Sequence, residues 1–406
     1  MVSVSNGDVD DSWPAVAYES LPWTSKPDPM ASRTARRRHR GPYDAAVPPT
    51  IAERSLRLAQ ETVAEMDDAT AEISRFDAEL GDEIAPFAAV LLRTESAASS
   101  RIENLTASAR AIATAEIGAH ASRNAALIVA NERAMNAAID LARRVDADAI
   151  LQMHHALLHE SDPDIAGRWR DRQVWVGGGR LGPHVALFIP PHHDRVQGLI
   201  DDLVAFIDRD DIGVLAHAAV AHAQFETIHP FADGNGRCGR ALVHAQLRLK
   251  GLTRNVTIPV SAGLLTDTDA YFDALTRYRD GDPVPIVEQF THAALAAVSN
   301  GRTLVCDLRT VRQEWTQRIT ARRTATAWKI ADLLLRQPVV NAAAISAAVG
   351  IVPQNVYRSL APLIEAGVVE ELTDKKRNQT WAAREVLDAI DRFAARAGRR
   401  NRASRH

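Results

Sequence analysis

Apolar residues recur every three or four positions over most of this chain, which is the spacing of one buried face of an α-helix. From Ala52 to about Arg144 the pattern predicts several amphipathic helices in succession. Alanine, which costs least in a helix interior, is abundant, and aromatic residues make up only 5% of the chain. We therefore expect a mainly α protein. Further helices are predicted over residues 196–207, 214–228, 235–250, 267–278 and 285–336.

The helical pattern breaks between Asp162 and Pro191. Two short apolar runs, residues 173–176 and 185–189, flank Gly177–Gly179. Apolar runs on either side of a glycine-rich turn predict a β-hairpin, and the two prolines that follow the second run end it.

Shorter elements are predicted in the last part of the chain. Two helices, at residues 341–350 and 353–367, each stop at a glycine. Candidate strands at 368–372 and 379–381 flank the polar turn 373–378. Two short helices followed by a two-stranded wing predict a winged helix-turn-helix domain.

Composition and charge narrow the class of protein. The 406 residues are 46% apolar and 24% charged with a net charge of −3, which is ordinary for a soluble globular protein and does not favour binding of nucleic acid by the whole chain. Arginines cluster near the ends, at residues 33–40 and 396–405, and such runs are usually solvated. Cys238 and Cys306 cannot build a disulfide framework. No apolar run reaches the length of a membrane span, so we expect no membrane contact and a cytoplasmic location.

Residues 229–240, with the sequence HPFADGNGRCGR, carry the candidate chemistry. Gly234 and Gly236 flank Asn235, so the backbone there can approach a ligand closely and adopt a positive φ. This loop opens a helix, whose free N–H groups and dipole favour an anion.

Charged side chains extend this candidate anion site. Arg237 and Arg240 lie three residues apart on one helical face, and two guanidinium groups suit a polyphosphate. Asp233 is placed to hold Mg²⁺, which proteins usually bind with one or two carboxylates plus substrate phosphates. His229 has the ordinary pKa of a general base near neutrality. Each feature alone is common in turns, cores and solvated helix faces, but their combination in one short segment indicates a nucleotide-phosphate site.

The segment resembles the signature of the Fic (filamentation induced by cAMP) family, His-x-Phe-x-Asp/Glu-Gly-Asn-Gly-Arg-x-x-Arg, at every fixed position. The resemblance extends over roughly residues 40–300 and includes Gly167–Arg170 and the predicted hairpin. It implies a Fic-type helical bundle with a β-hairpin flap. It also implies an enzyme that transfers AMP from ATP to a Ser, Thr or Tyr hydroxyl of a target protein.

The resemblance assigns a role to each matching residue. His229 would deprotonate the target hydroxyl, and Phe231 would anchor the loop in the core. Asp233 would hold Mg²⁺ on the α- and β-phosphates of ATP. The residues that would contact the phosphates are Gly234, Asn235, Gly236, Arg237 and Arg240.

Three further features follow from the same resemblance. The flap near Val174–Ile189 would align an extended segment of the target by strand addition. Tyr271 and Phe272 lie where related proteins form part of the adenine pocket, although a core aromatic pair is an equal alternative. A homodimer is also an expectation, because related proteins often form one.

An upstream segment, Ser99–Asn104, resembles the inhibitory pattern of the family, Ser/Thr-x-x-x-Glu-Gly/Asn. Ser99 and Glu103 are four residues apart and so share a helical face. The carboxylate of Glu103 would pair bidentately with Arg240 and make it unavailable to the γ-phosphate. The alternative is that Glu103 is a surface residue, with Asn104 merely ending the helix.

These patterns together predict six regions. They are a flexible N-terminal arm (1–45), a helical region with the inhibitory motif (46–145), the Fic core (146–300), a helical connector (301–325), a winged-helix module (326–390) and a basic tail (391–406).

The C-terminal module supports a second function, a DNA-binding regulator with the Fic core as a sensing or de-AMPylating module. Its second helix and its wing offer residue types that contact bases or phosphates, although neighbouring acidic residues weaken the positive field, and a protein partner or dimerisation is the alternative. The candidate contacts are Gln354, Asn355, Tyr357, Arg358, Lys375, Lys376 and Arg377.

The remaining histidines do not predict a zinc site. His217 and His222 precede His229 on one predicted helix at spacings of five and seven, whereas helical zinc pairs usually lie four apart. His192–His193 lie in a loop without an evident partner. His154–His155 lie on an apolar helix and are expected to be structural.

Overall fold

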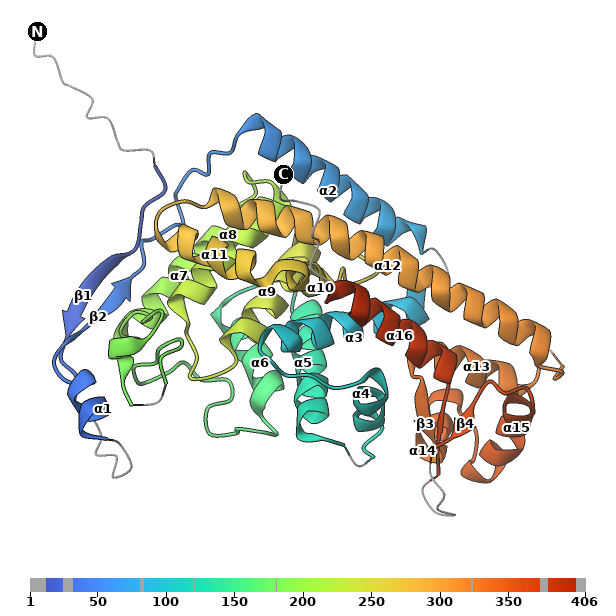
Figure 1. The fold of residues 1–406 in the computed structure, drawn as a ribbon. Helices are drawn as coiled ribbons and strands as arrows, with labels where there is room; N and C mark the ends of the chain where they lie inside the picture. The colour runs from blue at the N-terminus through green and yellow to red at the C-terminus, as the bar shows by residue number, and fades with distance from the viewer. Residues whose placement is uncertain are drawn as a thin grey trace, which may run out of the picture.

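The computed structural model describes residues 12–24, 32–80, 84–119, 121–179, 181–322, 324–372 and 379–398. It is mainly helical, as expected (Figure 1). The α-helices of the first three quarters of the chain are α1 (Arg33–Arg38), α2 (Gln60–Glu79), α3 (Ile84–Ile102), α4 (Ala109–Glu116), α5 (Arg123–Asp140), α6 (Ala147–Leu158), α7 (Val196–Ile207), α8 (Val214–Ile228), α9 (Asn235–Leu249), α10 (Val260–Leu264), α11 (Thr268–Arg279) and α12 (Val284–Arg318).

Helices α8 and α9 form the centre of the bundle. All residues of α8 from Leu215 to Ile228 are buried, and a helix that is apolar on all sides must be enclosed by others. Helices α2, α7, α11 and α12 contact α8, whereas α3, α5 and α6 contact α9. The loop that joins α8 to α9, which carries the candidate motif, is therefore fixed at both ends by the core.

Helix α12 extends beyond the predicted end of the Fic core. It runs unbroken from Val284 to Arg318, across the boundary predicted at residue 300, and α2 packs along it (Figure 1). It then stops, because Ile319 is extended, and a separate helix α13 (Thr326–Arg336) follows. The helical pattern predicted over residues 285–336 thus corresponds to two helices.

The C-terminal module contains β3 (Val339–Asn341), α14 (Ala342–Val349), α15 (Pro353–Glu365), β4 (Glu370–Glu371) and β5 (Thr380–Ala382). The three strands form an antiparallel sheet in the order β3-β5-β4. These elements follow one another in the order that the winged-helix interpretation requires. That interpretation and a DNA or protein partner stay predictions, and the turn at residues 373–378 lies outside the described residues.

Helix α16 (Arg384–Ala397) replaces the first part of the predicted basic tail. Its apolar face, which includes the buried Phe393, packs on α12 and α3. An amphipathic helix forms here because buried residues recur at helical spacing from Val386 to Ala397. Arginines from 399 onward lie outside the described residues.

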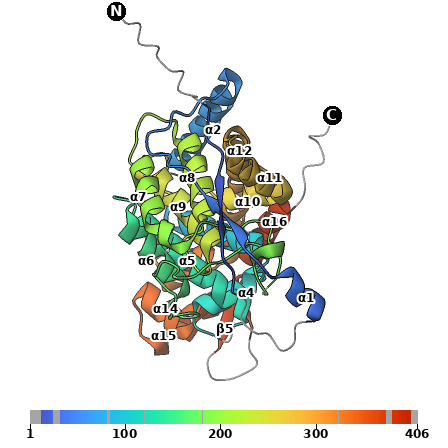
Figure 2. The same ribbon diagram turned by 90° about the vertical axis from the view of Figure 1, so that its left-hand side faces the viewer.

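The predicted N-terminal arm is partly a folded structure. Strands β1 (Ala17–Leu21) and β2 (Tyr43–Val47) pair in antiparallel fashion across one face of the bundle, as Figure 2 shows. The backbone N–H of Ala46 donates to the carbonyl of Ile189 at 3.0 Å. Composition suggested flexibility, but the buried Ala45 and Ala46 give this segment a core contact.

The predicted β-hairpin at residues 173–189 is reduced to a single antiparallel bridge between Val176 and Phe188. Gly177, Gly178 and Gly179 all have positive φ, and Pro183–Val185 forms a 3₁₀ turn, so the chain leaves the extended conformation at once. We call residues 173–189 the flap, which is a loop rather than a hairpin of two strands.

Within the described part of the chain, the helices are too short or too polar to cross a bilayer. The cytoplasmic location stays a prediction.

Candidate functional site

The loop between α8 and α9 is held in place by its own side chains. His229 ends α8 in the left-handed region, at φ 50°, and its N–H donates to the carbonyl of Phe225 at 2.8 Å. The side chain of Asn235 accepts from the N–H of Phe231 at 2.8 Å and donates to its carbonyl at 2.9 Å. The side chain of Asn235 is therefore engaged within the loop, and only its backbone is available for the predicted contact with phosphate.

Phe231 anchors the loop as predicted. Its ring is fully buried and stacks on His154, with the ring centroids 3.6 Å apart. His154 also bonds through Nε2 to the carbonyl of Asp233 at 3.0 Å, and burial lowers the pKa of His154 to about 4. The structural role expected for His154 is confirmed, because its neutral ring contacts both Phe231 and the backbone of Asp233 in the loop.

Arg170 is a residue whose role the sequence did not reveal. Its buried guanidinium donates through Nε to the carbonyl of His229 at 2.9 Å and through Nη2 to that of Pro191 at 2.5 Å. It thus ties the backbone of His229 to the end of the flap. The signal in the sequence was Arg170 itself, a charged residue just before the predicted hairpin.

A cavity of about 450 Å³ brings the motif, the inhibitory segment and the flap together. It is lined by His229, by Glu103 and by Val174–Val176 of the flap. Helix α9 begins at this cavity without a side-chain cap, so its first backbone N–H groups are free to bind an anion. The lining residues of the phosphate motif are Asp233, Gly234, Asn235, Gly236 and Arg237.

Glycine is required at position 236 by a close approach. A Cβ added to Gly236 would lie 2.0 Å from Oε1 of Glu103 and 3.0 Å from Nη1 of Arg240. The small residue thus leaves room for whichever group occupies this point, here the carboxylate of Glu103.

His229 is in the neutral form that can accept a proton. Burial, together with the charge of Arg170, lowers the pKa of His229 to about 4, so its imidazole is neutral near pH 7. Its Nδ1 lies 3.9 Å from Oε2 of Glu226. Burial raises the pKa of Glu226 to about 7, so this carboxyl group is partly protonated near neutral pH, whereas an ordinary glutamate is ionised.

Arg240 is engaged by the inhibitory segment. Its Nε donates to Oγ of Ser99, and its Nη2 donates to the carbonyl of Ser99 and to Oε1 of Glu103, each at 2.9 Å. Burial opposes the charge of Arg240, but the carboxylate of Glu103 outweighs it and raises the pKa of Arg240. Burial likewise acts to raise the pKa of Glu103, yet Arg240 leaves it lowered. The pair is therefore charged at neutral pH.

The geometry corrects one detail of the predicted contact. Glu103 accepts one hydrogen bond from Arg240, not the bidentate pair expected, and Ser99 accepts from Nε and from the same Nη2. Glu103 also lies just beyond the end of α3, at Ile102. Asn104 follows in the left-handed region, at φ 60°, which asparagine tolerates better than most residues.

Arg237 and Asp233 lie at the mouth of the cavity. Nη2 of Arg237 is 3.3 Å from Oδ2 of Asp233, and burial lowers the pKa of Arg237. The side chain of Asp233 is 62% exposed, so its carboxylate can still reach a ligand. One carboxylate beside a phosphate-sized anion site fits the way proteins usually hold Mg²⁺.

The two aromatic residues assigned to an adenine pocket differ in their burial. Tyr271 is buried, and its hydroxyl lies 2.8 Å from Nε2 of His222, so it is a core residue and not a cavity wall. Phe272 is 51% exposed and lines a neighbouring cavity of about 410 Å³ together with Asn104. Only Phe272 is placed to contact a ligand.

The flap is braced by the N-terminal segment, which the sequence did not predict. The ring of Trp23 meets that of Trp175 edge-on, with centroids 5.6 Å apart. The hydroxyl of Tyr43 is 3.2 Å from Oε1 of Gln173. These contacts hold the first part of the flap against the N-terminal segment, and Val174–Val176 also lines the cavity.

Comparison with known proteins agrees with this geometry. The Fic/DOC family model matches residues 144–247. The chain is 34% identical over 119 residues to protein adenylyltransferase fic-1 of Caenorhabditis elegans, which covers 29% of this chain and 22% of that protein. It is 28% identical over 149 residues to protein adenylyltransferase Fic of Nematostella vectensis, covering 37% and 32% of the two chains. The matches thus span about a fifth to a third of these relatives.

Among solved structures, a Fic family protein from Desulfovibrio desulfuricans G20 aligns with a TM-score of 0.48 and 19% sequence identity, covering 83% of this chain and 98% of that chain. The family match spans α6 to α9 and contains the whole of the motif from His229 to Arg240. Residues 144–247 of this chain are therefore a Fic/DOC family domain.

Proposed function

We propose that this chain is a protein adenylyltransferase, which moves AMP from ATP to a hydroxyl of a target protein and is held inactive by its own Glu103. The observation that carries the proposal is the 2.9 Å hydrogen bond from buried Arg240 to Glu103, which lines the same cavity as the motif. The names of the curated relatives support the reaction, and the contact supports the inhibition.

The phosphates of ATP would bind at the start of α9. Free backbone N–H groups of Gly236 and its neighbours, with the guanidiniums of Arg237 and Arg240, supply donors and positive charge. Asp233 would hold Mg²⁺, which would neutralise part of the phosphate charge. While Glu103 holds Arg240, one of these two guanidiniums is unavailable.

In the proposed reaction the target hydroxyl oxygen forms a bond to the α-phosphorus, and the bond to the bridging oxygen breaks, so that pyrophosphate leaves. His229 takes the hydroxyl proton. Its neutral imidazole and the fixed position of its backbone, held by Arg170, suit this role. Positioning and charge stabilisation supply the rest of the rate.

We propose that the target segment docks along residues Val174–Ile189 of the flap, on the side that lines the cavity. Among the described residues of the flap, only the bridge between Val176 and Phe188 has strand character, so strand addition would have to order the flap further. A homodimer and a partner of the C-terminal module stay predictions.

The test is intact-mass analysis of the purified protein after incubation with ATP and Mg²⁺. We expect Glu103→Gly to gain the mass of one or more AMP groups and the wild type to gain little. The double variant with His229→Ala should gain none. A Glu103→Gly protein that stays unmodified, and that also modifies no protein in a lysate with labelled ATP, would contradict the proposal.

A further inference from the structure

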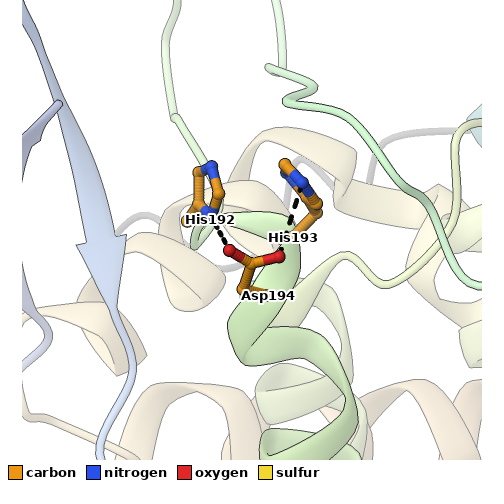
Figure 3. Close-up of side chains that lie close together, drawn as sticks. All are labelled: His192, His193 and Asp194. Carbon is orange, nitrogen blue, oxygen red and sulfur yellow. Dashed lines mark ion pairs between the residues drawn. The ribbon is translucent and has the colours of Figure 1, made fainter. Parts of the chain in front are cut away.

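His192, His193 and Asp194 form a compact cluster directly after the flap. The chain turns there through a 3₁₀ helix, His193–Arg195, into α7. Figure 3 shows both imidazole rings beside the carboxylate of Asp194. Nδ1 of His192 is 3.3 Å from one carboxylate oxygen, and Nε2 of His193 is 3.5 Å from the other. No partner for these histidines was predicted from the sequence, but Asp194, the next residue along the chain, lies beside both rings.

The distances in this cluster suit a shared metal ion better than hydrogen bonds. Charge-assisted hydrogen bonds between nitrogen and oxygen measure about 2.7–2.9 Å, which is shorter than either separation here. Bonds of about 2.0–2.2 Å to a tetrahedral Zn²⁺ place neighbouring ligand atoms about 3.3–3.5 Å apart. One donor atom from each of the three residues lies within 4.8 Å of the others, so a small adjustment brings all three onto one ion.

The donor set indicates the class of metal. Two imidazoles and one carboxylate are typical ligands of Zn²⁺ and of other first-row transition metals, whereas Mg²⁺ prefers oxygen alone. The side chains are 32%, 28% and 79% exposed for His192, His193 and Asp194, so a metal could enter from solvent and keep a water molecule as a further ligand.

The backbone around the cluster is held before any metal binds. Pro191, next to His192, accepts the hydrogen bond from buried Arg170, and the carbonyl of His192 accepts from the N–H of Arg195 at 3.0 Å. The guanidinium of Arg195 is bonded twice to Glu19, at 2.8 Å each, so it is not engaged with Asp194. Little conformational entropy would be lost when the ligands close on an ion.

We propose that His192, His193 and Asp194 form a binding site for one divalent transition-metal ion, such as Zn²⁺, separate from the Mg²⁺ position at Asp233. A bound ion would lock the turn at the end of the flap. Arg170 bridges this turn to the carbonyl of His229, so the ion would also stiffen the frame that positions the catalytic loop.

The test is isothermal titration of ZnCl₂ into the full-length, chelator-treated protein, without nucleotide. We expect one saturable equivalent that millimolar Mg²⁺ does not displace. Losing a group that merely supports a metal ligand costs about 10–100-fold in affinity. We therefore expect His192→Ala/His193→Ala, and Asp194→Asn alone, to weaken binding by at least that much. Co²⁺ absorption, read in the same proteins, should show the ligand-field bands only in the wild type.

The matched control is His155→Ala/His159→Ala, which removes another exposed histidine pair, with ring centroids 5.3 Å apart and Glu160 beside it. This variant should bind Zn²⁺ like the wild type, and circular dichroism should show all variants folded. The proposal is overturned if the wild type binds no equivalent, if the His192/His193 variant binds as tightly, or if the control loses the site. None of these results bears on AMP transfer, because no nucleotide is present.

Discussion

Replacing Glu103 by glutamine should increase the affinity of the protein for ATP. The change removes the negative charge but keeps the shape of the side chain. Residue 103 then competes less strongly with ATP for Arg240, and the substitution leaves no empty space in the protein. The side chain of Arg240 is only 3% exposed, whereas that of Glu103 is 42% exposed. A hydrogen bond between charged groups contributes about 1.5–3 kcal/mol, and the exposure of Glu103 places this pair near or below the lower end, at about 1–2 kcal/mol.

That energy corresponds to about a 5–30-fold lower Kd for ATP, since about 1.4 kcal/mol is tenfold. The assay is calorimetric titration of Mg²⁺–ATP in a His229→Ala background, which prevents turnover. The gain should shrink at high salt, because solvent reaches the carboxylate of Glu103 and counterions screen the pair.

The matched control for this measurement is Glu160→Gln, which breaks the exposed ion pair of Glu160 with Arg133. It should leave the Kd for ATP unchanged. If Glu103→Gln bound ATP no more tightly than the parent, or if Glu160→Gln gave the same gain, the competition between Glu103 and the nucleotide would be refuted.

Three other changes test the site and its frame. In the Glu103→Gly protein, the rate of AMP transfer should not fall between about pH 8 and about pH 6. The pKa of His229 is lowered to about 4, so the imidazole stays neutral in this range and becomes protonated only in more acid solution. A rate that halves near pH 6.5 would contradict this. Arg170→Lys should reduce kcat about 100-fold in that same protein, because one ammonium replaces the two separate nitrogens, Nε and Nη2, that reach the carbonyls of His229 and Pro191, and the base would shift. An unchanged kcat in a folded variant would exclude the positioning role. Phe393→Ala should lower the free energy of unfolding, measured with urea, by about 3–5 kcal/mol, because Phe393 is buried. Phe272 is exposed, so Phe272→Ala should lower it by less than about 0.5 kcal/mol. Equal losses would mean that α16 does not pack as described.

The sequence determined the local part of the site by itself. Helical spacing marked α8 and α9, and the glycines around Asn235 marked the loop between them, because backbone conformation and contacts four residues apart depend on nearby residues alone. The role of Phe231 followed from the resemblance to the Fic signature. Composition misled at the N-terminus, where β1 and β2 pair and β2 is hydrogen-bonded to the distant Ile189.

Tertiary structure decided the contacts between distant segments. Glu103 and Arg240 lie 137 positions apart, and which groups share the guanidinium depends on how α3 packs against α9. Burial of Tyr271 and the bracing of His229 by Arg170 have the same origin, since a side chain meets remote neighbours only after the helices have docked. The sequence by itself thus determined which residues could do the chemistry, and the packing of the helices decided which of them face one another.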